Sequence, residues 1–127
     1  MDELERNKQA VRAFWARAFR DGKPEDAAAE HIGRTYIQHN PLVPDGVEGF
    51  VKFVSGFLAQ FPQAADEEKQ LIAEGDRVVR FSHFKPSPDD RGMAAVDIFR
   101  LEDGKVVEHW DVLQPVPEES ANGNTMF

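Results

Sequence analysis

The sequence has 127 residues, of which 41% are hydrophobic and 30% are charged, and these values fit one compact domain, 1–127. A net charge of −8 without a basic cluster argues against a nucleic-acid partner, because phosphate binding relies on clustered Lys and Arg. The absence of cysteine excludes disulfides, thiol nucleophiles and thiolate metal sites. No apolar run reaches the roughly 20 residues of a membrane span, and the N-terminal stretch resembles no signal or transit peptide. We therefore expect a soluble, cytoplasmic protein.

Three helices are predicted in the first half of the chain. Residues 2–20 place apolar side chains at spacings of three, four and seven, which is typical of an amphipathic helix. A short helix is expected from Pro24 to Gly33. After an extended or irregular segment, a third helix is expected from Asp45, which has capping-box spacing with Glu48.

After Pro62 the hydrophobic period changes from about 3.6 to about 2, which indicates strands. Turn signals between the alternating segments predict four antiparallel strands, followed by a polar tail, expected to be mobile, over 115–127. Helices followed by a strand meander predict an α+β fold, in which the N-terminal helices cover one face of a curved antiparallel sheet and enclose a pocket. The four strands are expected at 68–74, 77–85, 92–102 and 105–114.

The last strand raises a question of function, because the consecutive residues EHWD at 108–111 put ionisable groups on a strand of a small domain. Alternation places Asp111 and His109 on one face and Trp110 on the other. If Asp111 points inward, the neighbouring strands add further side chains to a mostly apolar pocket with a few titratable groups. The candidate pocket then contains Phe81, His83, Asp97, Phe99, His109, Asp111 and Leu113.

Three stretches carry a family resemblance over roughly residues 4–115: YIQHNP, AEGDRVV and VDIFRLEDGKVVEHWDVLQ. They resemble the SnoaL-like polyketide cyclases of the nuclear-transport-factor-like superfamily. The resemblance implies a cone-shaped α+β barrel with a deep pocket, usually a homodimer packed through the outer sheet face. It also implies an intramolecular aldol condensation without metal or cofactor, with an aspartate acid/base that matches Asp111. A second polar residue, a histidine in the cyclases, matches Asp97 here.

The residues themselves are compatible with that chemistry. Cyclisation or isomerisation of an enolisable ketone needs a base, an acid and stabilisation of the enolate, and one carboxyl group can serve as base and then acid. We expect Asp111 in this role, with Asp97 as a second charge nearby. His39 or His83 is expected to hydrogen-bond the developing oxyanion. The expected ligand is a small hydrophobic or polyketide-like molecule, with no cofactor and no metal.

Other interpretations remain open at this point. Asp111 could instead pair with Arg100 or Lys105, and Asp97 could face solvent if the strand register differs. The domain could be a non-catalytic ligand-binding or dimerisation module. A metal-dependent enzyme using His39, His83, His109 and a carboxylate is a further alternative, although no HExxH spacing supports it.

The expected outer face of the sheet is apolar, and exposed patches of that kind usually mark an interface. The sequence therefore predicts a homodimer. The residues expected on this face are Val96, Ile98, Trp110 and Val112.

Overall fold

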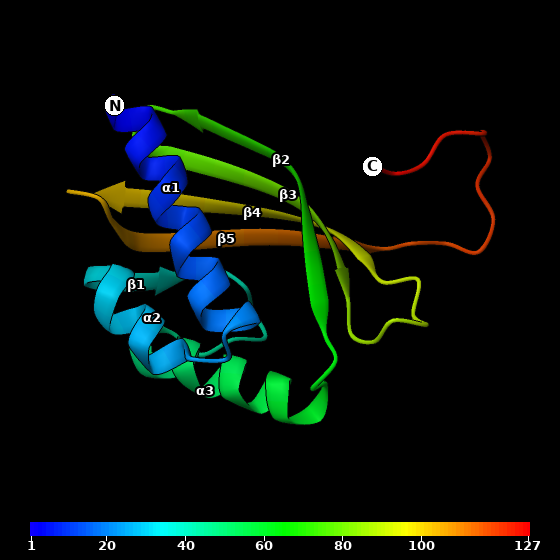
Figure 1. Cartoon of the computed structure of the whole chain (residues 1–127), viewed down its shortest axis with the longest axis horizontal. Coiled ribbons are helices and arrows are strands. Elements are labelled where there is room, and N and C mark those ends of the chain that lie inside the picture. Colours follow the sequence, from blue (N-terminus) through cyan, green and yellow to red (C-terminus); the bar gives the residue numbers. More distant parts are fainter.

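The computed structural model describes residues 1–127 and has three helices packed over one face of a sheet (Figure 1). Asp2 caps the first helix, since its carboxylate accepts a hydrogen bond of 2.9 Å from the Glu5 backbone N–H. None of the helices is both long and apolar enough to span a membrane. The predicted helices are confirmed as α1 (Glu3–Trp15) with a π-helical continuation η1 (Ala16–Arg20), α2 (Pro24–His31) and α3 (Gly46–Gln60).

The sheet has five strands in the order β1-β5-β4-β3-β2 and does not close on itself. The four predicted antiparallel strands are present, and each pairs with the next along the chain. The segment after α2, which was expected to be extended or irregular, is largely a fifth strand, and it pairs in parallel with β5. The α+β prediction is therefore confirmed, but the sheet is mixed rather than antiparallel. The strands are β1 (Ile32–Gln38), β2 (Ala65–Glu74), β3 (Arg77–Lys85), β4 (Met93–Glu102) and β5 (Lys105–Pro115).

The start of α3 differs from the capping box that the sequence predicts. Asp45 is the N-cap residue, but its side chain makes no capping hydrogen bond to the helix. Its Oδ1 accepts a hydrogen bond of 2.8 Å from the backbone N–H of Gln38, the last residue of β1. Asp45 therefore ties the end of β1 to the start of α3, and it fixes the position at which the chain leaves the sheet.

The core lies between the helices and the sheet and is rich in aromatic rings. Phe14 of α1 is fully buried, and its ring centroid lies 5.0 Å from Phe50 of α3 and 6.4 Å from Phe99 of β4. Because these rings come from three separate elements, they hold α1 and α3 at fixed positions above the sheet.

The C-terminal segment contains no helix or strand after Pro115, as expected, but it turns back towards the sheet (Figure 1). The ring of Phe127 lies 4.2 Å from that of His83 and 5.7 Å from that of Phe81. The Nζ atom of Lys69 lies 5.6 Å from the centre of the same ring. The tail thus covers part of the outer face of β2 and β3.

Candidate active site

A cavity of about 920 Å³ lies between the helices and the inner face of the sheet. This size is in the usual range for small-molecule sites, as is a largely apolar lining with a few polar groups. The polar groups collect on two sides, one on β4 and β5 and one on β2 and β3. The larger apolar side chains of the wall include Phe19, Phe50, Phe53, Phe57, Phe84 and Leu113.

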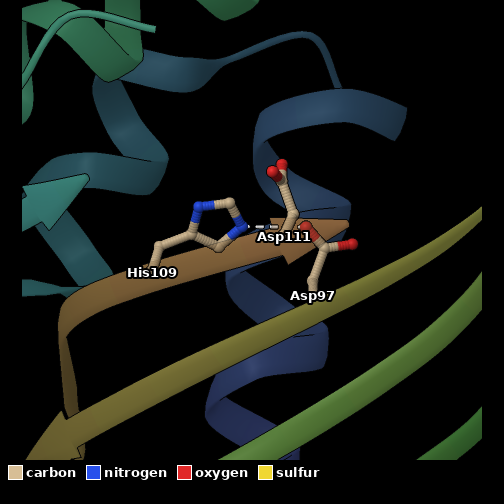
Figure 2. Close-up of side chains that lie close together, drawn as sticks. All are labelled: Asp97, His109 and Asp111. Atoms are coloured by element: carbon tan, nitrogen blue, oxygen red, sulfur yellow. Dashed lines mark hydrogen bonds and ion pairs between the residues drawn. The ribbon is translucent and has the colours of Figure 1, made fainter. Parts of the chain in front are cut away.

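Asp97, His109 and Asp111 come together on the wall formed by β4 and β5. Asp97 and Asp111 are direct partners across the two antiparallel strands, and His109 lies two residues before Asp111 on the same face. Figure 2 shows the three side chains rising from the same side of the sheet. One polar atom from each residue lies within 4.8 Å of those from the other two. The sequence therefore places this trio correctly on one face.

The Asp97 and His109 side chains form a buried pair. Asp97 is 5% exposed and His109 is 3% exposed, and His109 Nε2 lies 2.8 Å from Asp97 Oδ1. The other ring nitrogen, Nδ1, lies 2.9 Å from Oε1 of Gln38. Both nitrogens are therefore engaged. The ring is also enclosed by aromatic neighbours, with centroids 5.1 Å from Phe99 and 5.9 Å from Trp15.

Asp111 is half-buried and is held by Asn40, in the segment between β1 and α3. The Asn40 Nδ2 atom donates to both carboxylate oxygens, at 2.9 and 3.1 Å. The orientation of this amide is fixed, because its Oδ1 accepts a 2.9 Å hydrogen bond from the Leu42 backbone N–H. Since the Asn40 nitrogen can only donate, Asp111 acts as an acceptor in this arrangement.

Burial has a strong effect on the acidic groups of the site. It raises the pKa of Asp97, and the charge of Asp111 adds to the increase, whereas the hydrogen bond and the charge of His109 oppose it. Burial also raises the pKa of Tyr36 strongly, and the charges of Asp97 and Asp111 act in the same direction. Burial therefore favours the protonated form of Asp97.

Two of the expected pocket residues, Phe81 and His83, do not line the cavity. The expected face of β3 is wrong, because Arg80 and Ser82 pair with Asp97 and Ala95 of β4 and share their inward face. His83 instead lies on the outer side, where its Nε2 is 2.7 Å from the carbonyl oxygen of Arg91.

His39 and Phe99 also differ from the expectation, in different ways. His39 points outward, with its Nε2 2.7 Å from Glu108 Oε2 and its ring stacked 4.7 Å from that of Trp110. Phe99 faces inward but belongs to the fully buried core behind His109, not to the cavity wall.

Gln38 and Asn40 were not predicted from the sequence, although both belong to the YIQHNP stretch that carries part of the family resemblance. They flank His39, which the sequence suggested as a hydrogen-bond partner of the developing oxyanion. Because side chains alternate along an extended chain, an outward His39 leaves its two neighbours facing inward. Alternation applied to this short stretch would have found them.

The second polar group of the cavity wall is centred on Arg80, which is 5% exposed. Its Nη1 and Nη2 atoms donate to the two oxygens of Asp66, each at 2.9 Å. Asp66 also accepts a 2.9 Å hydrogen bond from Trp15 Nε1 on α1. Glu68 lies 3.5 Å from Arg80 Nε and is bound by Arg12, so two cations face two carboxylates.

Asp97, His109 and Asp111 have side chains of the kinds that bind cations, but most of their polar atoms already contact protein groups. His109 directs both nitrogens at protein partners, and Asp111 accepts from Asn40 through both oxygens. A metal ion would have to displace several of these hydrogen bonds. The histidines of the alternative metal site, His39 and His83, lie outside the cavity. The geometry thus favours a site that handles protons.

The mixed sheet, the helical cover and the polar cavity wall define a small α+β domain with an internal cavity. The chain belongs to the SnoaL-like polyketide cyclase family, whose sequence model matches residues 9–120. The resemblance noted in the sequence is thereby confirmed. No curated protein sequence is significantly similar to the chain.

Solved structures show the same fold. TsrD from Streptomyces laurentii is 24% identical, with a TM-score of 0.71 over 89% of this chain and 90% of that chain. A provisionally named polyketide cyclase from Bacillus cereus is 26% identical, with a TM-score of 0.70 over 82% of this chain and 71% of that chain. An NTF2-like protein of unknown function from Mesorhizobium loti is 22% identical, with a TM-score of 0.71 over 90% and 95% of the two chains.

Proposed function

We propose that this protein catalyses a cofactor-independent cyclisation or isomerisation of a small enolisable ketone, with Asp111 as the acid/base. The observation that supports this most directly is the trio of Asp97, His109 and Asp111 on one wall of a largely apolar cavity of about 920 Å³. The cavity would take a hydrophobic or polyketide-like molecule and exclude water around it. Membership of the SnoaL-like polyketide cyclase family supports the same class of substrate.

In the proposed reaction, Asp111 removes a proton from the carbon next to a ketone. The electron pair of that C–H bond forms the enolate. In a cyclisation, the enolate carbon attacks a second carbonyl carbon of the same molecule, so that one C–C bond forms and one C=O π bond becomes an alkoxide. The Asp97–His109 pair gives its proton to the alkoxide and is then reprotonated with the proton that Asp111 removed, so every group ends with its starting charge. No oxidant, reductant or leaving group is needed, which agrees with a site made only of acid/base groups.

The proposed roles of the two carboxyl groups differ because their surroundings differ. Both oxygens of Asp111 accept from the amide nitrogen of Asn40, which can only donate, and this pairing suits the carboxylate that a base requires. Burial raises the pKa of Asp97, which shares a 2.8 Å hydrogen bond with His109. Such a separation of environments is how one site provides both an acid and a base at the same pH. The Asp97–His109 pair is thus suited to protonate an enolate or alkoxide oxygen.

The proposal is tested by turnover of a panel of polyketide-like and other enolisable ketones by the wild type and the Asp111→Asn variant. Loss of a general acid/base typically lowers the rate by about 10² to 10⁴, and we expect a loss in kcat of that size. Asp103→Asn is a matched control, because Asp103 is exposed in the β4–β5 turn, with a φ of 50° that asparagine also adopts. Full turnover by Asp111→Asn would show that the catalytic assignment is wrong.

The same panel separates catalysis from simple binding. Ketones that bind, as measured by calorimetry, and are never converted would favour a non-catalytic ligand-binding module. Binding should then be similar for the wild type and for Asp111→Asn, because uniform binding does not need the base.

We also propose that the protein forms a homodimer through the outer face of the sheet. This face exposes several apolar side chains, of which Val112 is 72% exposed and Ile72 is 54% exposed. Half-buried Val96, Ile98 and Trp110 lie on the same face. A contiguous apolar surface of this kind is better accounted for by a covering partner than by contact with water.

A further inference from the structure

Gln38 has no acid/base chemistry of its own, yet it lies at the centre of the site. It is the last residue of β1, and the parallel pairing of β1 with β5 sets it directly beside His109. Its backbone N–H is held by Asp45, and its side chain reaches the ring of His109 from the side opposite Asp97.

The hydrogen bonds around Gln38 determine which nitrogen of His109 carries a proton. The Asn40 backbone N–H lies 3.0 Å from Gln38 Oε1, and because a backbone N–H can only donate, this atom must be the amide oxygen. The same oxygen lies 2.9 Å from His109 Nδ1. Since an amide oxygen can only accept, Nδ1 must be the donor. His109 therefore carries a proton on Nδ1.

The proton on Nδ1 limits the possible protonation states of the contact between His109 Nε2 and Asp97. Nε2 and Asp97 Oδ1 lie 2.8 Å apart, and a hydrogen bond at this distance needs one proton between them. That proton lies either on Nε2, which gives an imidazolium and a carboxylate, or on Oδ1, which gives a neutral ring and a neutral acid. In both arrangements the pair has zero net charge and one exchangeable proton.

We propose that Gln38 is a positioning residue that sets the tautomer of His109 and thereby keeps one transferable proton on the Asp97–His109 pair. The use of that proton in the reaction rests on the proposed function. The presence of the proton on the Asp97–His109 pair does not. Without an acceptor opposite Nδ1, a neutral His109 ring would donate from Nε2 to an ionised Asp97, and the pair would have one proton fewer and a charge of −1.

The groups that face the pair from the surrounding elements favour retention of the proton. Asp111 of β5 adds a negative charge, and Tyr36 of β1 stacks 6.3 Å from the His109 ring. Arg80 of β3 is the cross-strand partner of Asp97, but its guanidinium is bound through two hydrogen bonds to Asp66. On the helical side, the Trp15 ring lies 5.9 Å from the His109 ring. The charge of Arg80 lowers the pKa of Asp97, but its effect is the smallest of those on this carboxyl group, whereas burial has the largest effect and raises the pKa.

The test is the protonation of the His109 ring in ¹⁵N-labelled protein, observed by long-range ¹H–¹⁵N correlation between about pH 6 and pH 9, around the ordinary titration range of histidine. The His109 signals are assigned from their loss in His109→Gln. In the wild type, Nδ1 should have the shift of a protonated nitrogen over the whole range. In Gln38→Met, which has a side chain of similar length without an acceptor, the proton should move to Nε2 at the alkaline end.

Two further variants separate a specific role from a general disturbance. Gln38→Glu retains an oxygen acceptor and should keep the proton on Nδ1. Asn40→Ala retains the backbone N–H that orients Gln38, so the His109 signals should stay as in the wild type, although Asp111 loses its two donors. A Gln38→Met spectrum identical to that of the wild type would overturn the proposal.

The wild-type spectrum alone is also decisive if a variant does not fold. A neutral His109 protonated only on Nε2 would overturn the inference directly. None of these spectra depends on turnover, so the proposed reaction can fail while the tautomer assignment stands. If both hold, the alkaline limb of the kcat profile should move to lower pH in Gln38→Met, and Gln38→Glu should restore it.

Discussion

The Asp66–Arg80 ion pair provides the sharpest test of how the cavity wall is held together. Asp66→Asn keeps the shape of the side chain but removes its charge and replaces one acceptor oxygen by an NH₂ donor. The Arg80 side chain is 7% exposed and that of Asp66 is 18% exposed, so solvent screens the pair weakly. Asp66 accepts three hydrogen bonds, two from Arg80 and one from Trp15, and Asn cannot accept all of them.

The expected cost follows from the charge that is left behind. Breaking a buried pair from one side typically costs about 3 to 5 kcal/mol, because the remaining ion stays buried without compensation. Glu68 lies 3.5 Å from Arg80 Nε, but it is already bound to Arg12. We therefore expect the free energy of unfolding, measured by urea denaturation at neutral pH, to fall by about 3 kcal/mol or more.

The matched control is Glu67→Gln, on the same strand. The Glu67 side chain is 73% exposed and contacts Lys69 on the outer face, so its replacement should change the unfolding free energy by no more than about 0.5 kcal/mol. The double variant Asp66→Leu/Arg80→Met removes both charges and should recover much of the loss. A cost below about 1 kcal/mol for Asp66→Asn, the range of surface pairs, would refute this account of the wall.

Three further predictions concern the acid, the assembly and the metal. Because burial raises the pKa of Asp97 above its ordinary value of 3.8, folding takes up a proton there, and the associated stability is lost as pH rises through the folded pKa. The wild-type unfolding free energy relative to that of Asp97→Asn should therefore decrease above about pH 4, by at most about 1.4 kcal/mol per pH unit, in denaturation curves at several pH values. Light scattering at micromolar concentration should give the dimer mass, and Val112→Glu, at a 72% exposed position, should shift it towards monomer; monomer mass for the wild type would contradict the homodimer. Elemental analysis should find no stoichiometric metal, whereas about one zinc or iron per chain, removed by chelator with loss of activity, would favour a metal site.

The helices and the strands β2 to β5 were predictable because their signals are local. Apolar spacing of three and four, a change to alternation after Pro62 and the turn glycines are each contained within a few residues. β1 was not predictable in this way. Its burial does not alternate regularly, its register with β5 shifts between Ile32 and Ile37, and its partner lies about 70 residues further along the chain. Only the folded sheet supplies the hydrogen bonds that make this segment a strand.

The face of β3 was misjudged for a different reason. Alternation offers two sets on this strand, one with Phe81 and the other with Arg80 and Ser82, and the more apolar set is normally the buried one. Here Arg80 is buried because Asp66, 14 residues away on β2, neutralises it at 2.9 Å. A buried ion pair reverses the usual choice of face, and the composition of the strand alone does not contain that information.

The EHWD stretch of β5 shows what strand alternation predicts and what it does not. Alternation holds, with Glu108 on the outer face and His109 and Asp111 on the inner face. The stretch can carry polar residues on both faces because each of them has a hydrogen-bond partner on another segment. Glu108 contacts Arg100 at 2.7 Å, His109 contacts Gln38 at 2.9 Å, and Asp111 contacts Asn40. Without such partners, burying these polar side chains in a strand would cost free energy. A run of polar residues on a predicted strand therefore indicates a polar site, with its partners elsewhere in the fold. These partners come from β4, from the end of β1 and from the segment that follows β1, so the EHWD stretch alone does not identify them.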